Sequence, residues 1–182
     1  MIIPERIDTE RLILRPFTLR DAADVFDYAT NPEWSRFLPV PEPYTFADAE
    51  TFIALCLLRD PKKARAWAIE SVGKVIGCVE LHFKNDQQTL GEMHWSISQP
   101  HWGKGLMTEA AVAVCNTTFS TFISCHRIYA QALPENVGSW RVMEKIGMQH
   151  EGTLRQIFRL KGEWGDLATY AILRPEWEEL IN

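Results

Sequence analysis

The sequence lacks the cysteine and histidine spacings that build disulfide frameworks or metal sites. Its four cysteines, Cys56, Cys78, Cys115 and Cys125, lie far apart and form no Cys-x-x-Cys pair. Its five histidines show no ligand spacing such as two histidines four residues apart on a helix. We therefore expect free buried thiols, structural histidines and no bound metal.

Long apolar runs and an excess of basic residues are also missing. No uninterrupted apolar stretch approaches the length that crosses a bilayer, and the opening residues MIIPERIDTERL carry charges every few positions. Lys and Arg total 19 against 24 Asp and Glu, a formal net charge of −5. Nucleic-acid binding usually leaves a basic footprint. These absences predict a cytoplasmic protein that binds neither nucleic acid nor membranes.

The chain does have enough apolar content for a substantial core. It contains 182 residues, of which 46% are hydrophobic, and this length suits one core better than two. No repeat, low-complexity tract or linker divides it. We expect a single domain over residues 1–182.

Hydrophobic periodicity predicts both strands and helices along the chain. Three consecutive strands joined by short turns indicate antiparallel hairpins, and four prolines between residues 30 and 45 indicate a loop without regular helix. Strands are expected at 11–17, 65–71, 74–83, 91–98, 126–133, 148–160 and 166–173, and helices at 19–29, at 46–59, from 106 onward and at 137–147.

Two glycines stand directly before the helix that begins near Leu106. A helix N-terminus presents unpaired N–H groups and the positive end of the helix dipole. Gly103 and Gly105 permit positive φ and a close backbone approach, so this stretch predicts a cradle for phosphate oxygens. An ordinary glycine turn is the alternative. Lys104 between them adds charge or is simply solvated.

The strand at 91–98 alternates between an apolar and a polar face. Successive side chains of a strand point to opposite sides. One side therefore carries Met93, Trp95 and Ile97, and the other carries Glu92, His94, Ser96 and Ser98.

Three stretches together resemble the GNAT superfamily of acyl-CoA-dependent N-acetyltransferases. They are TERLILRPFTLRDA (9–22), GEMHWSISQPHWGKGLMTEAA (91–111) and PENVGSWRVMEKIGM (134–148). They are most similar to the branch of the ribosomal-protein N-terminal acetyltransferases (Rim-type). The resemblance implies an α+β (mixed α/β) fold in a single domain, with a central twisted, mostly antiparallel sheet of about seven strands flanked by about four helices. It also implies that the sheet splits between the strands at 92–98 and 127–133.

The same resemblance places acetyl-CoA in that split. Asn136 and Ser139 match an asparagine and a serine that touch the cofactor arm, although Asn136 also suits a plain helix N-cap. A strand amide near Ile97 would polarise the acetyl carbonyl. Trp102 stands where much of the superfamily has glutamine or arginine, and Met107 where it has a small residue. The phosphate-loop positions are Trp102, Gly103, Lys104, Gly105, Leu106, Met107 and Thr108.

Acetyl transfer to an amine requires a group that removes a proton, because amine pKa values lie at about 8 for an α-amine and about 10.4 for lysine. Glu92 holds the family-like position for this base, His94 is the alternative and Glu80 is a third candidate. Many relatives have a tyrosine where this chain has Met143. Ser139 is then the nearest replacement for an acid that protonates the leaving thiolate.

The acceptor amine is the least defined part of the prediction. Aromatic residues either edge an acceptor pocket or fill the core, and acidic residues either attract a cationic amine or belong to the ordinary surface. By resemblance we expect direct transfer in a ternary complex to a protein or peptide N-terminus, with a small-molecule amine (amino acid, polyamine or antibiotic) or a non-catalytic acyl-CoA sensor as alternatives and a homodimer as the assembly. The aromatic residues are Trp34, Phe37, Tyr44, Phe158 and Trp164, and the acidic ones are Asp48, Glu50, Glu163 and Asp166.

Overall fold

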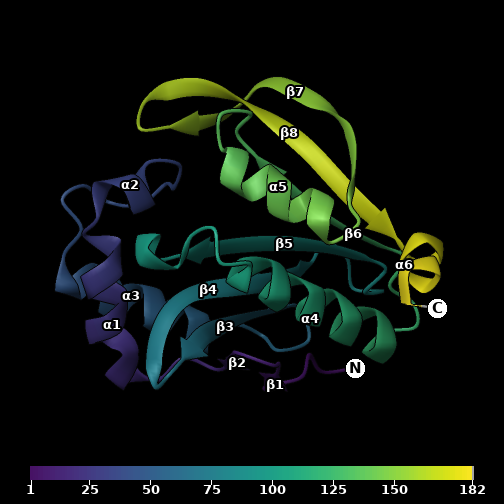
Figure 1. Cartoon of the computed structure of the whole chain (residues 1–182), viewed down its shortest axis with the longest axis horizontal. Helices are drawn as coiled ribbons and strands as arrows, with labels where there is room; N and C mark the ends of the chain where they lie inside the picture. Colours follow the sequence, from purple (N-terminus) through teal and green to yellow (C-terminus); the bar gives the residue numbers. More distant parts are fainter. Residues whose placement is uncertain (182) are drawn as a thin grey trace.

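A computed structural model describes residues 1–181 and contains one mixed sheet with helices on both faces (Figure 1). Its strands are β1 (Ile7–Asp8), β2 (Ile13–Arg15), β3 (Ala64–Ser71), β4 (Lys74–Phe83), β5 (Leu90–Ile97), β6 (Arg127–Ala132), β7 (Gln149–Leu160) and β8 (Glu163–Leu173). Its helices are α1 (Ala22–Ala29), α2 (Pro32–Ser35), α3 (Phe46–Leu57), α4 (Leu106–Thr121), α5 (Val137–Lys145) and α6 (Arg174–Ile181), with short 3-10 turns at Leu19–Asp21 and Gln99–His101.

The mixed α/β class is confirmed, although residues 1–181 contain eight strands and six α-helices where about seven and four are expected. The strand expected at 11–17 is wrong in extent, since β2 has three residues and pairs with the unforeseen β1. The proline-rich loop also contains the one-turn α2. Its proline starts the helix rather than blocking it, because Pro32 follows the Asn31 N-cap, whose side chain accepts from the Glu33 N–H.

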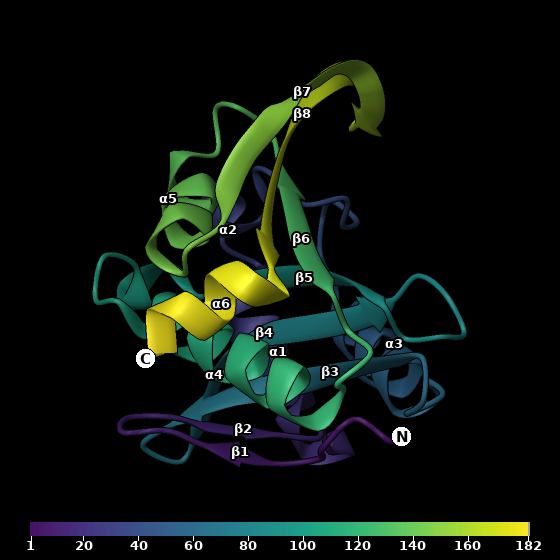
Figure 2. The same ribbon diagram turned by 90° about the vertical axis from the view of Figure 1, so that its right-hand side faces the viewer.

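The sheet is antiparallel except where β5 meets β6. The strand order is β1-β2-β3-β4-β5-β6-β8-β7, so the last hairpin inserts β8 next to β6. The parallel β5–β6 pairing covers 90–92 and 127–129. Beyond it the two strands diverge, as Figures 1 and 2 show, and the predicted split is confirmed. The upper half of the V is formed by β6, β8 and β7.

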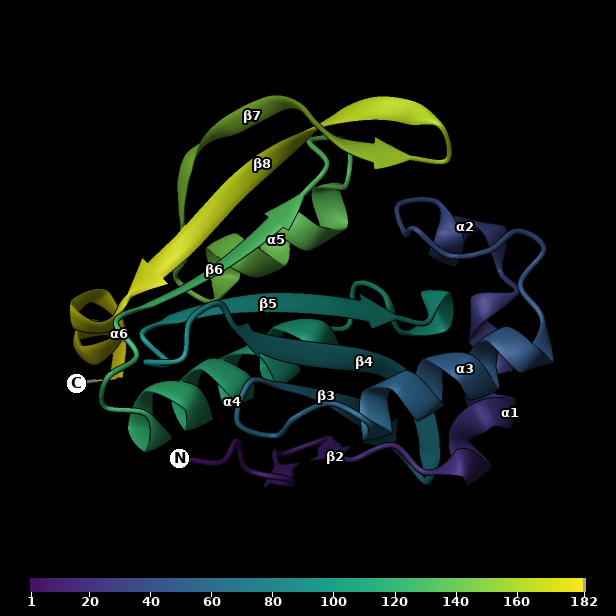
Figure 3. The same ribbon diagram turned by 180° about the vertical axis from the view of Figure 1, so that it is seen from behind.

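Each face of the sheet has its own hydrophobic core. One core lies under α4, α5 and α6 and includes Met93 and Phe119. The other lies under α1, α2 and α3, on the side seen in Figure 3, and includes Tyr28 and Ile53. Val79 of β4 belongs to the core under α4, α5 and α6. The residues directly before and after it on that strand therefore point to the opposite face of the sheet. The polar residues of β4 and β5 therefore face the α1–α3 side.

None of the helices within 1–181 is both long enough and apolar enough to traverse a bilayer. The cysteines are unpaired, and three of them, Cys78, Cys115 and Cys125, are buried.

Candidate active site

The glycine loop joins β5 to α4 and has the conformation that its glycines allow. Gly103 and Gly105 have φ values of +71° and +75°, a region that side chains with a Cβ rarely adopt. Gly105 is the N-cap residue of α4. A Cβ placed on Gly103 would meet nothing within 4 Å, so there is open space beside the loop for an anionic group. The helix dipole of α4 favours negative charge there.

Contacts from the β1–β2 turn hold this loop in place. The Arg11 Nη1 donates to the main-chain carbonyl of Lys104 at 3.0 Å, and its Nε pairs with Glu109 Oε2 at 2.6 Å. Thr9 Oγ1 donates to the other carboxylate oxygen of Glu109 at 2.6 Å. Arg11 and Glu109 were not foreseen as site residues, because they lie 98 positions apart and no local pattern links them.

A cleft of about 610 Å³ opens along the split and is lined by the end of β5, the glycine loop and the start of α5. Arg36, Arg141 and Lys145 line it against two carboxylates, Glu33 and Glu135, so its lining is net positive in a chain of net charge −5. This charge and the open loop fit the diphosphate of coenzyme A. Of the predicted cofactor residues, the cleft is lined by Ile97, Trp102, Gly103, Gly105, Leu106, Met107, Thr108, Asn136 and Ser139.

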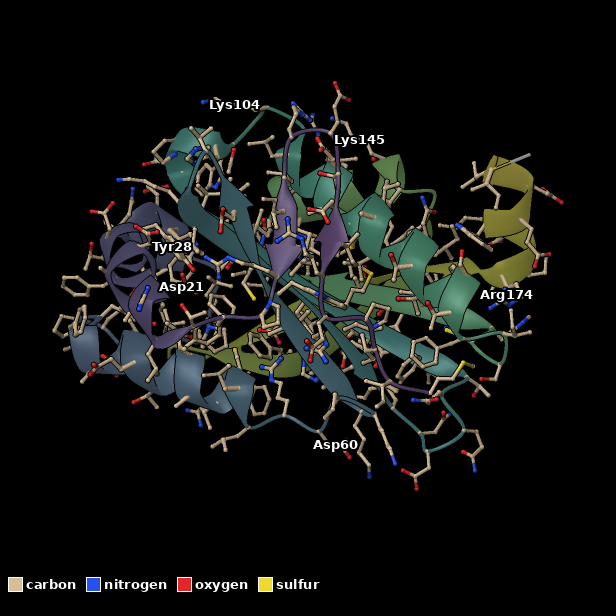
Figure 4. All side chains as sticks on the ribbon, turned by 90° about the horizontal axis from the view of Figure 1, so that it is seen from below. Asp21, Tyr28, Asp60, Lys104, Lys145 and Arg174 are labelled. Carbon is tan, nitrogen blue, oxygen red and sulfur yellow. The ribbon has the colours of Figure 1, made fainter. Side chains whose placement is uncertain are left out.

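Lys104 is the predicted cofactor residue that does not line the cleft. Its side chain is exposed, at the edge of the molecule labelled in Figure 4, while its carbonyl accepts the bond from Arg11. Leu106 and Met107 are buried in the core beneath the loop. The backbone of the loop is therefore its chemically important part, as the two glycines indicate.

The main chain of β5 presents polar groups to the split. The Ser98 N–H donates to the Ile76 carbonyl at 2.8 Å, so even-numbered residues of this region bond to β4. In an antiparallel ladder the odd-numbered residues then face the other way. The N–H groups of Trp95 and Ile97 thus face the split. The Ile97 carbonyl on that side accepts from Trp102 Nε1 at 2.7 Å.

The start of α5 forms the opposite wall of the cleft. The Asn136 side chain accepts from the Ser139 N–H at 3.2 Å, which confirms the predicted N-cap. Both residues also line the cleft. Met143, at the position where the resemblance implies a tyrosine in many relatives, is 1% exposed and lies in the core. Met143 does not line the cleft.

Glu92 and His94 share one face of β5, as the alternation predicts. The His94 Nε2 lies 3.3 Å from Glu92 Oε2, and the Lys84 Nζ donates to the same oxygen at 2.8 Å. The hydrogen bond from His94 lowers the pKa of Glu92 to about 2; burial opposes this and Lys84 reinforces it. Glu92 is consequently a weak proton acceptor at neutral pH.

A second carboxylate and imidazole pair lies beside the first. The His82 Nε2 is 2.8 Å from Glu80 Oε2, and Arg59 Nη1 donates to that oxygen at 2.6 Å. Burial raises the pKa of Glu80, but the bonds from His82 and Arg59 outweigh it and bring the pKa to about 2. The His82 and His94 rings meet edge to face at 5.3 Å. Although four acidic and imidazole groups gather here, residues 1–181 contain no group of three or more that could hold a metal ion.

A second cavity, of about 370 Å³, adjoins the cofactor cleft on the α1–α3 side. Trp34, Leu38, Trp95 and Ser96 line both spaces. His94 lines the second cavity, whereas Glu92 lines neither. The second cavity is otherwise lined by Val25, Tyr28, Pro39, Val40, Tyr44, Phe52, Cys78, Glu80 and His82.

The predicted acceptor residues divide between these spaces and the surface. Trp34 and Tyr44 line the second cavity, Phe37 lines the cofactor cleft, and Phe158 and Trp164 line neither. None of the four acidic residues proposed to attract an amine lines either space. The sequence did not point to Tyr28, on α1 and labelled in Figure 4, or to Phe52 as pocket residues, because their helical spacing is that of ordinary core positions.

A split sheet, a glycine loop at a helix N-terminus and a net positive cleft define the class of acyl-CoA-dependent acyltransferases. Residues 11–149 match the acetyltransferase (GNAT) domain family, and the chain belongs to that family. The uncharacterised N-acetyltransferase YnaD of Bacillus subtilis is 31% identical over 174 residues, covering 94% of this chain and 98% of the relative. A crystal structure of a GNAT-family acetyltransferase from Bacillus anthracis superposes with a TM-score of 0.81 at 29% identity, covering 93% of this chain and 99% of that one.

Relatives with named acceptors differ in what they acetylate. The ribosomal protein uS5 alanine N-acetyltransferase of Escherichia coli is 34% identical over 83 residues, which is 46% of this chain and 42% of that enzyme. The spermidine N(1)-acetyltransferase of the same organism is 27% identical over 168 residues, covering 90% of this chain and 87% of that enzyme. The protein is therefore an N-acetyltransferase of a family that uses acetyl-CoA, and family membership alone does not select the acceptor.

Proposed function

We propose that the protein transfers an acetyl group from acetyl-CoA to a primary amine by direct attack in a ternary complex. One observation carries this proposal: the cofactor cleft and the second cavity share Trp95 and Ser96 of β5. Donor and acceptor would meet at that edge, so that positioning supplies much of the rate acceleration. The acceptor of first choice is the α-amine of a protein or peptide N-terminus, in line with the similarity to the uS5 alanine acetyltransferase.

A small-molecule amine is the second candidate acceptor. The match to the spermidine acetyltransferase covers 90% of this chain, about twice the share that the match to the uS5 enzyme covers. The second cavity is also of the size that suits small ligands.

His94 is the group that we propose accepts the proton of the amine. It lines the second cavity, whereas Glu92, the family-like position, lines neither space. When the imidazole donates its Nε2–H to Glu92, its Nδ1 lone pair is free to accept a proton. Glu92 would then act as the residue that orients His94, and Glu80 is held by Arg59 and His82.

The remaining groups fit the other needs of acetyl transfer. Acetyl-CoA would supply an activated thioester, and we propose that the N–H groups of Trp95 and Ile97, which face the split, donate to its carbonyl oxygen. The Ser139 hydroxyl in the cofactor cleft is the proposed donor to the departing thiolate. Burial raises the pKa of Cys78 well above its usual value and that of Cys115 to about 12, so neither thiol is a ready nucleophile. This supports transfer without an acetyl-cysteine.

A thiol-release assay tests the proposed function. The purified protein is incubated with acetyl-CoA and single amines, including alanine- and serine-starting peptides, phenylalanine, spermidine and an aminoglycoside. Amine-dependent thiol release and a product heavier by one acetyl group are expected for at least one amine. Acetyl-CoA binding without thiol release for any amine would instead indicate a non-catalytic acyl-CoA sensor.

Location and assembly remain predictions. Four unpaired cysteines suit a reducing compartment, which supports the proposed cytoplasmic location. The proposed homodimer is tested by the mass of the purified protein in solution.

A further inference from the structure

We propose that the acceptor is a primary amine that carries an aromatic ring close to the nitrogen. This inference rests on the proposed acetyl transfer and adds the chemistry of the group beside the amine. Two sources share that chemistry: a free arylalkylamine, and a peptide whose first residue is aromatic. The second cavity would bind the ring, and its edge with the cofactor cleft would hold the amine.

The walls of the second cavity match an aromatic ring. Tyr28, Trp34, Tyr44 and Phe52 come from α1, α2, the proline-rich loop and α3. The Tyr28 and Trp34 ring centroids lie 5.2 Å apart, and those of Trp34 and Tyr44 lie 6.3 Å apart with the planes near perpendicular. These spacings are typical of aromatic clusters, to which a further ring can add edge or face contacts.

The size of the cavity argues against a small first residue. The methyl group of an alanine would fill little of about 370 Å³ and leave water against four aromatic side chains. A phenyl or indole group displaces that water and buries apolar surface on both partners. Size therefore favours an acceptor with a ring over one with a methyl or hydroxymethyl group.

The charge of the cavity argues against a polyamine. Glu80 is the one carboxylate among its lining residues, and it is already paired with Arg59 at 2.6 Å and with His82 at 2.8 Å. A polyamine has further ammonium groups that need carboxylate partners when they leave water. The cavity supplies no unpaired carboxylate for them, whereas a single amine that loses its proton needs none.

The position of the base agrees with this arrangement. His94, Trp95 and Ser96 form the β5 edge of the cavity, and the last two also line the cofactor cleft. An amine at this edge lies beside the proposed proton acceptor. The aromatic group one to three carbon atoms away then occupies the space bounded by α1 and α3.

A matched panel of acceptors tests the inference. We would measure kcat/KM for phenethylamine against propylamine, for a phenylalanine-starting tetrapeptide against its alanine-starting counterpart, and for spermidine. Burial of a ring is worth enough to give the aromatic member of each pair an advantage of about tenfold or more. The pair with the higher absolute kcat/KM identifies the source, free amine or peptide.

Two outcomes separate this inference from the proposed function. If propylamine, the alanine peptide or spermidine is acetylated with a kcat/KM equal to that of the aromatic amines, the inference is wrong. The proposed acetyltransferase activity then still stands. If no amine on the panel supports thiol release although acetyl-CoA binds, the proposed function itself fails.

A space-filling substitution ties the preference to the cavity. Val40 lines the second cavity and not the cofactor cleft, so Val40→Trp should fill it. We expect the ratio of kcat/KM for phenethylamine to propylamine to fall about tenfold. Calorimetry should show weaker phenethylamine binding to the CoA-saturated protein and unchanged affinity for acetyl-CoA.

The control is Ile123→Trp, which adds the same bulk at a residue that is 71% exposed and lines neither space. It should leave the ratio unchanged. A folded Val40→Trp protein with an unaltered ratio would overturn the assignment of the cavity. If circular dichroism shows that Val40→Trp does not fold, Tyr44→Leu replaces it and should likewise reduce the ratio.

Discussion

At the residue scale, His94 and Glu92 contact each other but differ in their access to the second cavity. Both belong to the polar face of β5, but His94 has half of its side chain exposed and lines the second cavity. Glu92 is largely buried and bonds to His94 and Lys84. A carboxylate with a pKa of about 2 accepts a proton poorly at neutral pH, which leaves the imidazole as the proposed proton acceptor.

Substitution of each member separates the base from the residue that orients it. We expect His94→Gln to lower kcat by about 10²- to 10⁴-fold, the range typical of a lost general base. Glu92→Gln should cause a smaller loss, because the imidazole remains and only its orientation is weakened. The affinity for acetyl-CoA, measured by calorimetry, should change little in both variants.

His150→Gln is the control for that experiment, since His150 is exposed and lines neither space. A larger loss in Glu92→Gln than in His94→Gln would return the role of the base to Glu92. The pH profile of kcat/KM adds a second readout, because only loss of the base should remove its acidic limb.

Local residue patterns predicted the conformation of the glycine loop. Gly103 and Gly105 were identified from the sequence as positions of positive φ, because glycine adopts that region whatever the tertiary fold. Arg11 was not, because its contact with the loop is made only after distant segments fold together. The division of roles between Glu92 and His94 also depends on tertiary packing, which alternation along one strand does not specify.

At the element scale, the glycine loop and α4 form the unit that we propose binds the diphosphate. Gly105 is both the N-cap of the 16-residue helix and the last residue before its first turn. Strand and helix types were predictable here because apolar periodicity and the cap of α5 are encoded within a few residues. The helix α2 was missed because Pro32 was taken to prevent a helix, although proline is tolerated in a first turn. No helix was predicted over the residues of α6, in which Pro175 also stands in the first turn.

Gly105→Val should abolish the cradle without dismantling the fold. Its φ of +75° is unfavourable for a β-branched residue, so the loop either strains or changes shape. We expect acetyl-CoA binding by calorimetry to weaken at least about tenfold, equivalent to about 1.4 kcal/mol. The free energy of unfolding should fall by roughly 1–3 kcal/mol.

Gly73→Val provides a matched control. Gly73 has the same φ of +75°, and a Cβ there meets nothing within 4 Å, but it lies in the β3–β4 turn. The two variants should lose similar stability while only Gly105→Val loses affinity for acetyl-CoA. Equal binding by both would mean that the loop does not bind the diphosphate.

At the scale of the whole molecule, a seam of paired charges joins β4 and β5 to the segment that follows α3. The paired carboxylates Glu80 and Glu92 lie on the neighbouring strands β4 and β5; Glu80 lines the second cavity, and Glu92 lies on the strand that borders the split. Their partners come from the segment after α3, from β4 and the turn after it, and from β5, so the seam forms only when these segments have folded together. Acid that neutralises it should therefore destabilise the entire fold.

The direction of this acid effect follows from the two lowered pKa values. Glu80 and Glu92 have pKa values of about 2 in the folded protein against 4.5 for the free side chain. The unfolded chain binds more protons in this range, so the stabilisation is complete above pH 4.5 and is lost as the pH falls towards 2. The loss for Glu80 is about 3 kcal/mol, because each pKa unit is worth about 1.4 kcal/mol.

Urea unfolding at several pH values between 7 and 2 measures that loss in the wild-type protein and in Glu80→Gln. The variant should be less stable at pH 7, because Arg59 and His82 lose a charged partner, and its free energy of unfolding should fall less steeply below pH 5. Glu50→Gln, an exposed residue on α3, should follow the wild-type curve. If Glu80→Gln kept the wild-type slope, the seam would not control stability in acid. Carboxylates elsewhere, such as Asp21 beside Arg15, would then account for the loss of stability at low pH.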